Sequence, residues 1–329
     1  IPINEGVTDI TQFDPADHSL VRVGEMWRPR WYASSTTLPN GEVLIQGGDG
    51  GRDRPEVRTV NGDFRLLTGA NTFNINWFYP RNFVAPGGKV FGMAWRRMYR
   101  IDPAGSGSLE DLGMFPGGNM GPSSTAVMFA PGRILQVGGG NDINNASTAA
   151  STIDIRGATP SVTPVAPMSR RRHWGNATVL ADGRVFVSGG SKVKNANDVV
   201  AYRSELYDPA TGAWALGATA ARMRLYHSTS LLLPDASVLT AGGGSPGPQR
   251  NLNAEIYYPP YLFDANGNRA TRPRITSAPM TRRVGALLYL TTPDLASIAR
   301  VTLVKTGSVT HSFDMDQRFI DVVEWKTAR

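Results

Sequence analysis

A short unit that recurs five times along the chain is the feature that most restricts the possible fold. Each copy has a turn rich in Pro, Gly, Asn or Asp and then a β-branched strand, and most copies end in two glycines. Internal repeats of one period are typical of architectures in which similar supersecondary units pack side by side. The strands of the five copies are marked by Val43, Val90, Ile134, Val185 and Val238, at steps of 47, 44, 51 and 53 residues.

The chemistry of this unit favours a β-propeller. Asn40-Gly41 and Asp182-Gly183 supply the positive φ that tight hairpins need. Paired glycines such as Gly47-Gly48 let strand ends crowd together near an axis, because they carry no side chains. A period of about 50 residues with four strands per blade is that of the kelch repeat. We therefore predict an all-β, kelch-type propeller of five blades, with a remnant of an earlier blade in residues 1–23.

The pattern changes near Pro273, where a second domain is predicted to begin. Segments 274–276, 285–290, 299–305 and 319–323 have the composition of strands in a sandwich. An immunoglobulin-like sandwich needs about 100 residues, and fewer than 60 follow Pro273. The predicted domains are therefore residues 1–272, the propeller, and residues 273–329, part of an immunoglobulin-like domain. We expect the chain to be a fragment that lacks early blades and half of the sandwich.

Composition excludes several classes of site. The sequence has no cysteine, so no disulfide, zinc-thiolate site or thiol nucleophile can form within it. The net charge is +7, but the arginines are scattered through strand and turn patterns. That scatter favours a solvated surface or contacts with acidic glycans over nucleic-acid binding. No apolar run approaches the ~18 residues of a membrane helix. The first residues lack the features of a signal peptide, which fits a mature N-terminus or a cytosolic protein.

Only four histidines are present, so each can be weighed as a ligand. His227 follows Tyr226 at the start of the innermost strand of the fifth blade, a place where such a pair is more often structural. His311 is predicted at a hairpin tip of the last domain. His173 is predicted at the corresponding position one blade earlier. His18 lies in a turn and is expected to be solvated.

Several motifs together resemble the galactose oxidase and glyoxal oxidase family of copper radical oxidases. The resemblance runs in order over nearly the whole chain, and in that family the propeller has seven blades. The matching segments are residues 30–34 (Arg-Trp-Tyr-Ala-Ser), 225–228 (Leu-Tyr-His-Ser), 253–263 (Asn-Ala-Glu-Ile-Tyr-Tyr-Pro-Pro-Tyr-Leu-Phe), 272–275 (Arg-Pro-Arg-Ile) and 310–318 (Thr-His-Ser-Phe-Asp-Met-Asp-Gln-Arg).

The resemblance implies one role for each matched residue. Tyr32 falls on the equatorial tyrosine that carries the radical, and Tyr226 on the axial tyrosine that takes the substrate proton. His227 and His311 fall on the two imidazole ligands, the second carried by a hairpin pushed through the propeller axis. Two imidazoles and two phenolic oxygens suit a single tetragonal Cu(II). The implied reaction oxidises a primary alcohol or aldehyde with dioxygen and yields hydrogen peroxide, in a secreted, monomeric protein.

Three departures from the family restrict this reading. The family joins its radical tyrosine to a cysteine, and here that Tyr-Cys cofactor depends on a cysteine outside the chain. No tryptophan follows Gly47-Gly48, so we expect Tyr32 to lack the tryptophan that shields the radical in galactose oxidase. Residues 139–144 do not match the galactose-binding loop. A glyoxal-oxidase-like or general alcohol oxidase is therefore predicted rather than a galactose-specific one.

Two other functions stay open on the sequence. The chain could be a non-catalytic kelch module that binds glycans or a protein partner, with Tyr32 or His311 turned away from the site. It could also be a copper-binding pseudoenzyme that lacks the Tyr-Cys cofactor. The oxidase hypothesis instead requires that Tyr32, Tyr226, His227 and His311 converge.

Overall fold

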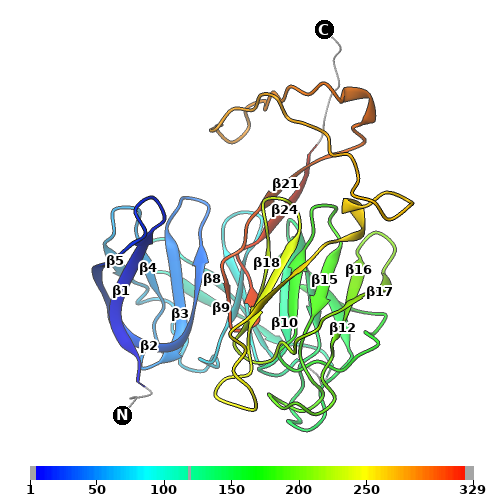
Figure 1. The fold of residues 1–329 in the computed structure, drawn as a ribbon. Helices are drawn as coiled ribbons and strands as arrows, with labels where there is room; N and C mark the ends of the chain where they lie inside the picture. The colour runs from blue at the N-terminus through cyan, green and yellow to red at the C-terminus, as the bar shows by residue number, and fades with distance from the viewer. Residues whose placement is uncertain (1–4, 118–119, 323–329) are drawn as a thin grey trace.

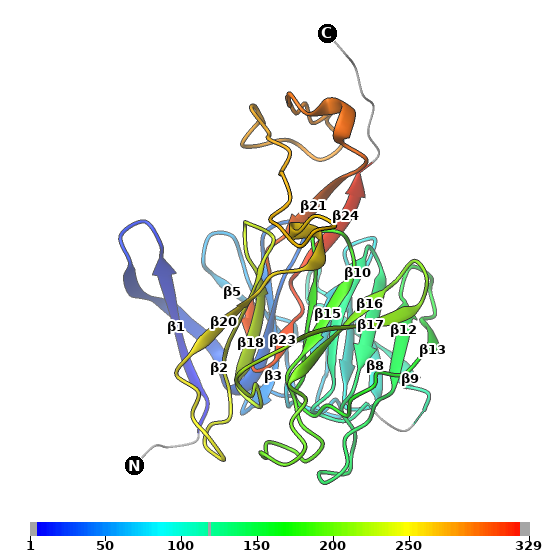
Figure 2. The same ribbon diagram turned by 45° about the vertical axis from the view of Figure 1, so that its right-hand side comes forward.

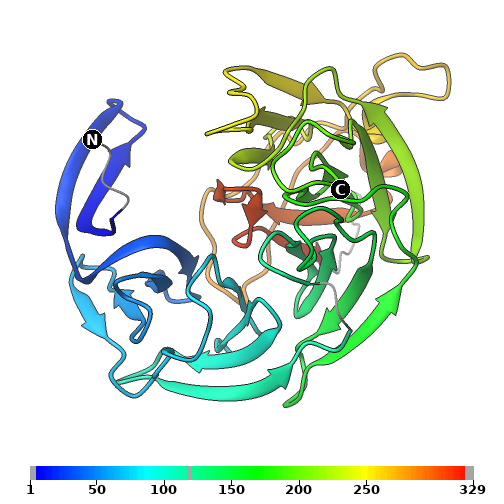
Figure 3. The same ribbon diagram turned by 90° about the horizontal axis from the view of Figure 1, so that it is seen from below.

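The regular secondary structure of the chain consists almost entirely of β-strands, and most of them surround a common axis (Figures 1 and 3). The structure is a computed structural model and describes residues 5–117 and 120–322. Within these residues, antiparallel sheets built from consecutive strands follow one another round the axis. The predicted all-β propeller arrangement with five blades is therefore confirmed.

The first sheet contains one blade and an additional hairpin. Its strands are β1 (Val7–Asp14), β2 (Ser19–Thr37), β3 (Val43–Asp49), β4 (Glu56–Arg58) and β5 (Phe64–Leu66). The long strand β2 serves both parts, because its first half pairs with β1 and its second half with β3. The hairpin of β1 and β2 thus precedes the blade, where a remnant of an earlier blade was predicted.

The next three blades are four-stranded antiparallel sheets and the fifth has three strands. The second contains β6 (Arg81–Val84), β7 (Val90–Ala94), β8 (Arg97–Asp102) and β9 (Ser108–Met114). The third contains β10 (Thr125–Ala130), β11 (Arg133–Val137), β12 (Ala150–Asp154) and β13 (Ser161–Val165). The fourth contains β14 (Asn176–Val179), β15 (Val185–Ser188), β16 (Arg203–Asp208) and β17 (Ala213–Thr219). The fifth contains β18 (Ser228–Leu232), β19 (Val238–Gly242) and β20 (Ala254–Tyr257).

The repeated turns of the sequence form equivalent hairpins between the first two strands of four blades. In each hairpin a backbone N–H donates to the carbonyl four residues later, at 2.8 Å in every case. The third position of these loops has positive φ, for example 87° at Gly41 and 88° at Gly183. Glycine adopts this conformation at little cost, which explains why the turn residues recur. The four donor and acceptor pairs are Leu38 and Glu42, Ala85 and Lys89, Leu180 and Arg184, and Leu233 and Ser237.

Three blades also share an ion pair made by a buried arginine, a feature that the repeat pattern of the sequence does not predict. In each, an arginine pairs with a glutamate on the third strand of the blade; Arg172 and Arg224 precede the innermost strand, and Arg30 lies within β2 just before its pairing with β3. The arginine also donates to the carbonyl of the first glycine in the Gly-Gly pair. Each pair therefore ties the start of one strand to two others. The pairs are Arg30 with Glu56 at 2.7 Å, Arg172 with Glu205 at 2.9 Å and Arg224 with Glu255 at 3.2 Å.

The C-terminal residues return to the propeller axis. Strands β21 (Val301–Lys305) and β24 (Arg318–Val322) pair above the blades (Figure 2). The hairpin of β22 (Val309–Thr310) and β23 (Phe313–Asp314) connects them and enters the space enclosed by the blades. Ser312 N–H donates to the Ser228 carbonyl at 2.7 Å. Gln317 makes two hydrogen bonds with the backbone of Val179, at 2.8 and 2.7 Å. These contacts fix the hairpin against the inner strands β18 and β14.

The prediction of strands at 274–276 and 285–290 is wrong. In the described chain these segments have no ladder, and only an isolated bridge joins Ser277 to Thr291 nearby. The side chains of Ile275, Val284 and Tyr289 are exposed, so no second sheet covers them. A strand without a partner sheet leaves its polar backbone groups unpaired, and the sequence pattern alone cannot supply that partner. The predicted strand at 299–305 is present as β21, and residue 323 of the last predicted strand lies outside the described residues.

Helical structure in the described residues consists of two short 3-10 turns, η1 (Pro260–Leu262) and η2 (Leu295–Ser297). Neither these nor any other described segment forms a helix with the length and apolar character needed to cross a membrane. The predicted domain boundary between residues 272 and 273 follows η1 and remains a prediction.

We expect the free energy of unfolding to fall as the pH rises from about 4 to about 7, because of Asp314 at the end of the axial hairpin. This carboxyl is 2% exposed, and burial, with the adjacent Asp316, raises its pKa to about 7, although Lys305 and Arg318 oppose the rise. The unfolded chain releases this proton near pH 4 and the folded chain near pH 7, so folding becomes less favourable as the pH rises through that window.

Asp314→Asn should remove this dependence, since the amide is neutral throughout. Its melting temperature relative to the wild type should increase between pH 4.5 and pH 8, measured by circular dichroism. The matched control is Asp321→Asn, because Asp321 is exposed and its pKa is lowered by Arg300. A constant difference between Asp314→Asn and the wild type across this range would contradict the assignment.

Candidate metal centre

The inner strands bring one repeated position of each blade to the axis. Counting eleven positions back from the five residues that mark the repeat leads to Tyr32, Tyr79, Ser123, Trp174 and His227. Four of these have positive φ, at 67° for Tyr32, 47° for Tyr79, 58° for Trp174 and 68° for His227. The left-handed region costs a non-glycine residue about 1–2 kcal/mol. Strain of this kind clusters at functional sites, where the surrounding structure maintains it.

The predicted hairpin tip delivers His311 to the same place. Val309 pairs with Asp314 and Thr310 with Phe313, so His311 and Ser312 form a two-residue turn. Both turn residues have positive φ, 51° and 70°, a geometry that normally selects Asn-Gly. Seen along the axis, this hairpin lies in the middle of the ring of blades (Figure 3).

The four residues predicted as ligands come together from three separate parts of the chain. The ring centroids of His227 and His311 are 4.8 Å apart, and those of Tyr226 and His227 are 3.8 Å apart. The His311 centroid lies 6.1 Å from that of Tyr32 and 6.0 Å from that of Tyr226. All four side chains are half-buried. The other three rings thus each lie within contact distance of the His311 ring, as the oxidase hypothesis requires. Neither Tyr32 nor His311 points away from the other ligands.

The hydrogen bonds of the two imidazoles leave one nitrogen of each available. His227 donates from Nδ1 to the Ser245 carbonyl at 3.1 Å, and His311 Nδ1 is hydrogen-bonded to the Thr310 hydroxyl. In the described residues neither Nε2 has a protein partner. A bond at Nδ1 that fixes the tautomer and ring orientation is the usual arrangement for metal-binding histidines.

Burial keeps these groups in the protonation states that a ligand set needs. Burial lowers the pKa of His227, and burial together with the neighbouring His227 lowers the pKa of His311 to about 4. Both imidazoles are therefore neutral near pH 7. Burial raises the pKa of Tyr226, and the Tyr32 phenol adds to the rise. Tyr226 therefore keeps its proton until a positive charge, such as a metal ion, stabilises the phenolate.

The donor set fits Cu(II). Two neutral imidazole nitrogens and two phenolic oxygens suit a tetragonal copper site with an open position. In the described residues no group of three or more His, Asp or Glu side chains could hold a metal ion, so a metal here depends on the tyrosines. The Tyr-Cys part of the family's cofactor does not fit the sequence, because none of the 329 residues is cysteine.

The other two histidines are excluded as ligands. His173 is 1% exposed, and both its nitrogens are occupied, Nδ1 by the Ser123 hydroxyl at 2.6 Å and Nε2 by the Asp142 carbonyl at 2.9 Å. By the spacing of the repeat, His173 corresponds to Tyr226 and Trp174 to His227, so His173 lies at the predicted entry to the inner strand. His18 stacks on Phe13 in the exposed β1–β2 turn.

Several aromatic residues near the site were missed in the sequence. Trp31 stacks on Tyr32, with centroids 4.1 Å apart, which corrects the expectation that Tyr32 has no shielding tryptophan. The indole comes from the adjacent residue rather than from the segment after the Gly-Gly pair. Tyr79 and Trp174 also face the site, and the regular spacing of the repeat was the signal that could have identified them.

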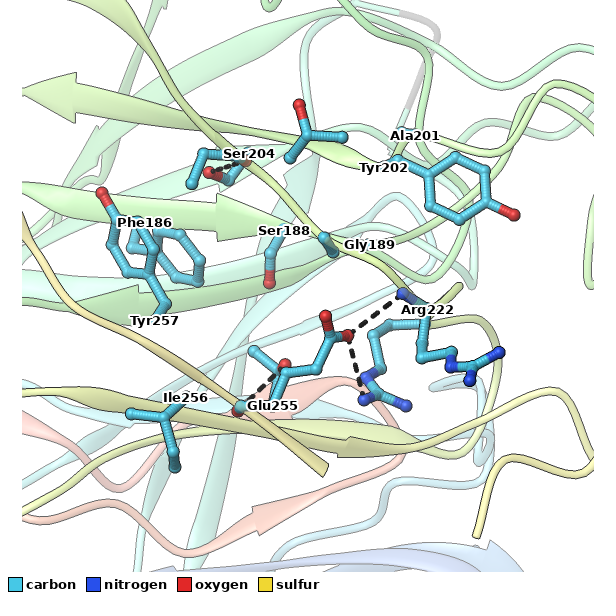
Figure 4. A pocket seen from close by; sticks show the side chains of 15 residues that line it. Phe186, Ser188, Gly189, Ala201, Tyr202, Ser204, Arg222, Glu255, Ile256 and Tyr257 are labelled. Carbon is cyan, nitrogen blue, oxygen red and sulfur yellow. Dashed lines mark hydrogen bonds and ion pairs between the residues drawn. The ribbon is translucent and has the colours of Figure 1, made fainter. Parts of the chain in front are cut away.

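The cavity drawn in Figure 4 lies elsewhere, between the fourth and fifth blades. Its volume of about 90 Å³ has room for roughly three water molecules. Glu255 projects into it, accepts a hydrogen bond from the Ala221 N–H at 2.7 Å and pairs with Arg224. None of the four predicted ligands lines this cavity. Of its three charged lining residues, Arg224 and Glu255 form one of the repeated ion pairs, and the third is Arg222.

Comparisons with known proteins agree with the motifs. The family model described as "Galactose oxidase-like, Early set domain" matches residues 272–328. A galactose oxidase of Gibberella zeae is 26% identical, over 94% of this chain and 50% of its own length. A putative aldehyde oxidase of Artemisia annua, Art an 7, is 25% identical, over 96% of this chain and 64% of its own length.

A solved structure shares the fold. A fungal alcohol oxidase of the AA5 family, determined in complex with copper, superposes with a TM-score of 0.86 at 24% identity. The match covers 96% of this chain and 71% of the oxidase chain. The chain spans about half to two thirds of the length of the curated relatives it matches. Over 94–96% of its length, this chain is similar to members of the galactose oxidase and glyoxal (aldehyde) oxidase family, and it shares the fold of the solved alcohol oxidase.

Proposed function

We propose that the protein is a copper radical oxidase that oxidises a primary alcohol or an aldehyde with dioxygen and produces hydrogen peroxide. The observation that carries the proposal is the convergence of Tyr32, Tyr226, His227 and His311 at the axis, with both Nε2 atoms free. The galactose-binding loop of the family has no match here, so a glyoxal-oxidase-like substrate is proposed. Action outside the cell and a monomeric state remain predictions.

Each residue has a separate task in this proposal. His227 and His311 hold the metal through Nε2, and Tyr32 and Tyr226 complete the set with their phenolic oxygens. Bound copper would supply one-electron redox chemistry and a position where substrate and dioxygen bind. Tyr226 takes the hydroxyl proton of the substrate, and Tyr32 takes a hydrogen atom from its carbon. The substrate thus loses two electrons and two protons, and dioxygen gains both to become hydrogen peroxide.

A thioether partner for Tyr32 would have to come from outside these residues, since the sequence has no cysteine. That fact favours one alternative, a protein that binds copper but does not form the Tyr-Cys radical. Trp31, stacked on Tyr32, supports the oxidase instead, because an indole over the ring shields a tyrosyl radical from solvent. The two alternatives differ in whether the copper-loaded protein produces peroxide.

The test is to load the full-length protein with Cu(II) in air and measure peroxide from primary alcohols and aldehydes. Tyr226→Phe should lower kcat by at least about 100-fold, because a general base contributes about 10²–10⁴. Tyr202→Phe is the matched control, since Tyr202 is a partly exposed tyrosine of the fourth blade outside the site, and its activity should equal that of the wild type. Copper binding without peroxide from any substrate would establish the pseudoenzyme instead.

A further inference from the structure

Tyr79 occupies in the second blade the position that Tyr32 and His227 occupy in theirs, yet none of the family motifs in the sequence includes it. All three lie eleven positions before the residue that marks their repeat, and all three have positive φ. The Tyr79 N–H donates to the Tyr32 carbonyl at 3.2 Å, which joins two neighbouring blades at this point. The fold therefore directs the Tyr79 side chain to the same axial centre.

The ring of Tyr79 is enclosed by the proposed ligands and their neighbours. Its centroid is 4.8 Å from those of Tyr32 and His311, and 5.4 Å from that of Phe313. Only 2% of Tyr79 is exposed, so the residue does not offer a surface to a substrate. These contacts alone would be satisfied equally well by phenylalanine.

The hydroxyl distinguishes Tyr79 from a packing residue. It lies 2.9 Å from the hydroxyl of Tyr226, and in the described residues this is its only hydrogen-bond partner. A buried tyrosine hydroxyl normally finds its partner in a backbone carbonyl or a polar side chain. Here the partner is the phenol proposed to coordinate the metal and take the substrate proton. A phenolate oxygen can only accept hydrogen bonds, so Tyr79 must donate to it whenever Tyr226 is deprotonated.

We propose that Tyr79 is a positioning residue for Tyr226, whose hydroxyl it holds at the metal centre by a phenol-to-phenolate hydrogen bond. This inference rests on the proposed copper site and extends it by a third tyrosine. The donated hydrogen bond stabilises the Tyr226 phenolate and directs its remaining lone pairs towards the metal position, as hydrogen bonds to a metal ligand generally do.

The first test uses the copper-free, full-length protein and a double-mutant cycle. Tyr79→Phe, Tyr226→Phe and the double variant are compared by the shift of the urea unfolding midpoint. If the two hydroxyls bond to each other, the double variant should be shifted by clearly less than the sum of the single shifts. Additive shifts would overturn the proposal. Tyr99→Phe is the matched control, because the buried Tyr99 hydroxyl bonds to Gln46 and Asn82 and should combine additively with Tyr226→Phe.

The second test uses the copper-loaded protein and its visible spectrum. Removing the donor leaves the Tyr226 phenolate more electron-rich, so its charge-transfer band to Cu(II) should move to longer wavelength in Tyr79→Phe. The shift should be absent when Tyr79→Phe is made in the Tyr226→Phe background and absent in Tyr99→Phe. The same shift in both backgrounds, or no shift in either, would overturn the proposal.

The two tests separate this inference from the proposed function. A wild-type protein that binds copper and makes no peroxide would refute the oxidase, while the spectra would still report on Tyr79. A wild-type protein that binds no copper at all would refute the metal site. In that case the positioning role at a metal falls with it, even where the copper-free cycle still detects the hydrogen bond.

Discussion

His227→Ala is expected to lower the affinity of the protein for Cu(II) by at least about 100-fold. Loss of groups that merely orient a ligand costs about 10–100-fold in metal affinity, and here the ligand itself is removed. The imidazole is neutral near pH 7, and within residues 5–117 and 120–322 its Nε2 has no hydrogen-bond partner that would compete with the metal. A half-buried side chain leaves only a small cavity, so the fold should be retained. Competition with a chelator of known affinity measures the change.

The matched control for this prediction is His18→Ala. His18 is an exposed histidine of the β1–β2 turn and should contribute nothing to copper affinity. His311→Ala should match His227→Ala, because the two imidazoles are the proposed nitrogen donors. Equal copper affinity of His227→Ala and His18→Ala would refute the assigned ligand set, provided that circular dichroism shows both variants folded.

Arg172→Met is expected to lower the free energy of unfolding by about 3–5 kcal/mol, the usual cost of breaking a buried ion pair. Both partners are 1% exposed, and Glu205 would be left as a buried charge without its guanidinium. The arginine also donates to the carbonyls of Gly189 and Arg203, at 2.6 Å each, which would lose their partner. The fourth blade should therefore be the first to open, and urea unfolding followed by tryptophan fluorescence measures the loss.

The matched control is Arg97→Met. Arg97 pairs with Asp111 on the surface of the second blade, and both side chains are about half exposed. Such a pair contributes roughly 0–1 kcal/mol because water already solvates both charges. A cost for Arg172→Met no greater than that for Arg97→Met would show that the repeated ion pair does not stabilise the blades.

The repeat in the sequence predicts the position of some residues of the metal centre but not of others. Tyr226 and His227 are adjacent, and their place at the start of an inner strand follows from the repeat. His311 lies 84 positions from His227 in the sequence, and no periodicity relates the two. Its position comes from Ser312, which bonds to Ser228, and from Gln317, which bonds to Val179. Only the resemblance to a family suggested this hairpin in advance.

The contacts of Tyr79 and Trp31 could not be predicted from the sequence, because they depend on side-chain directions. The repeat places Tyr79 at the axis, but the identity of its partner depends on the side-chain directions in the fifth blade. Trp31 stacks on Tyr32 from the neighbouring position in the sequence, and not from the segment after the Gly-Gly pair. Ring stacking depends on side-chain torsions, and these are set by the packing of all surrounding elements.

The sequence by itself determined the blades, because their strands pair with neighbours in the chain and their turns need glycine, asparagine or aspartate at particular positions. It also determined the residue types at the axis. Tertiary structure alone decided which of those residues meet, since the axial hairpin and the inner strands are distant in the sequence. It likewise decided that residues 274–276 and 285–290 are not strands, because a strand forms only where another strand pairs with it.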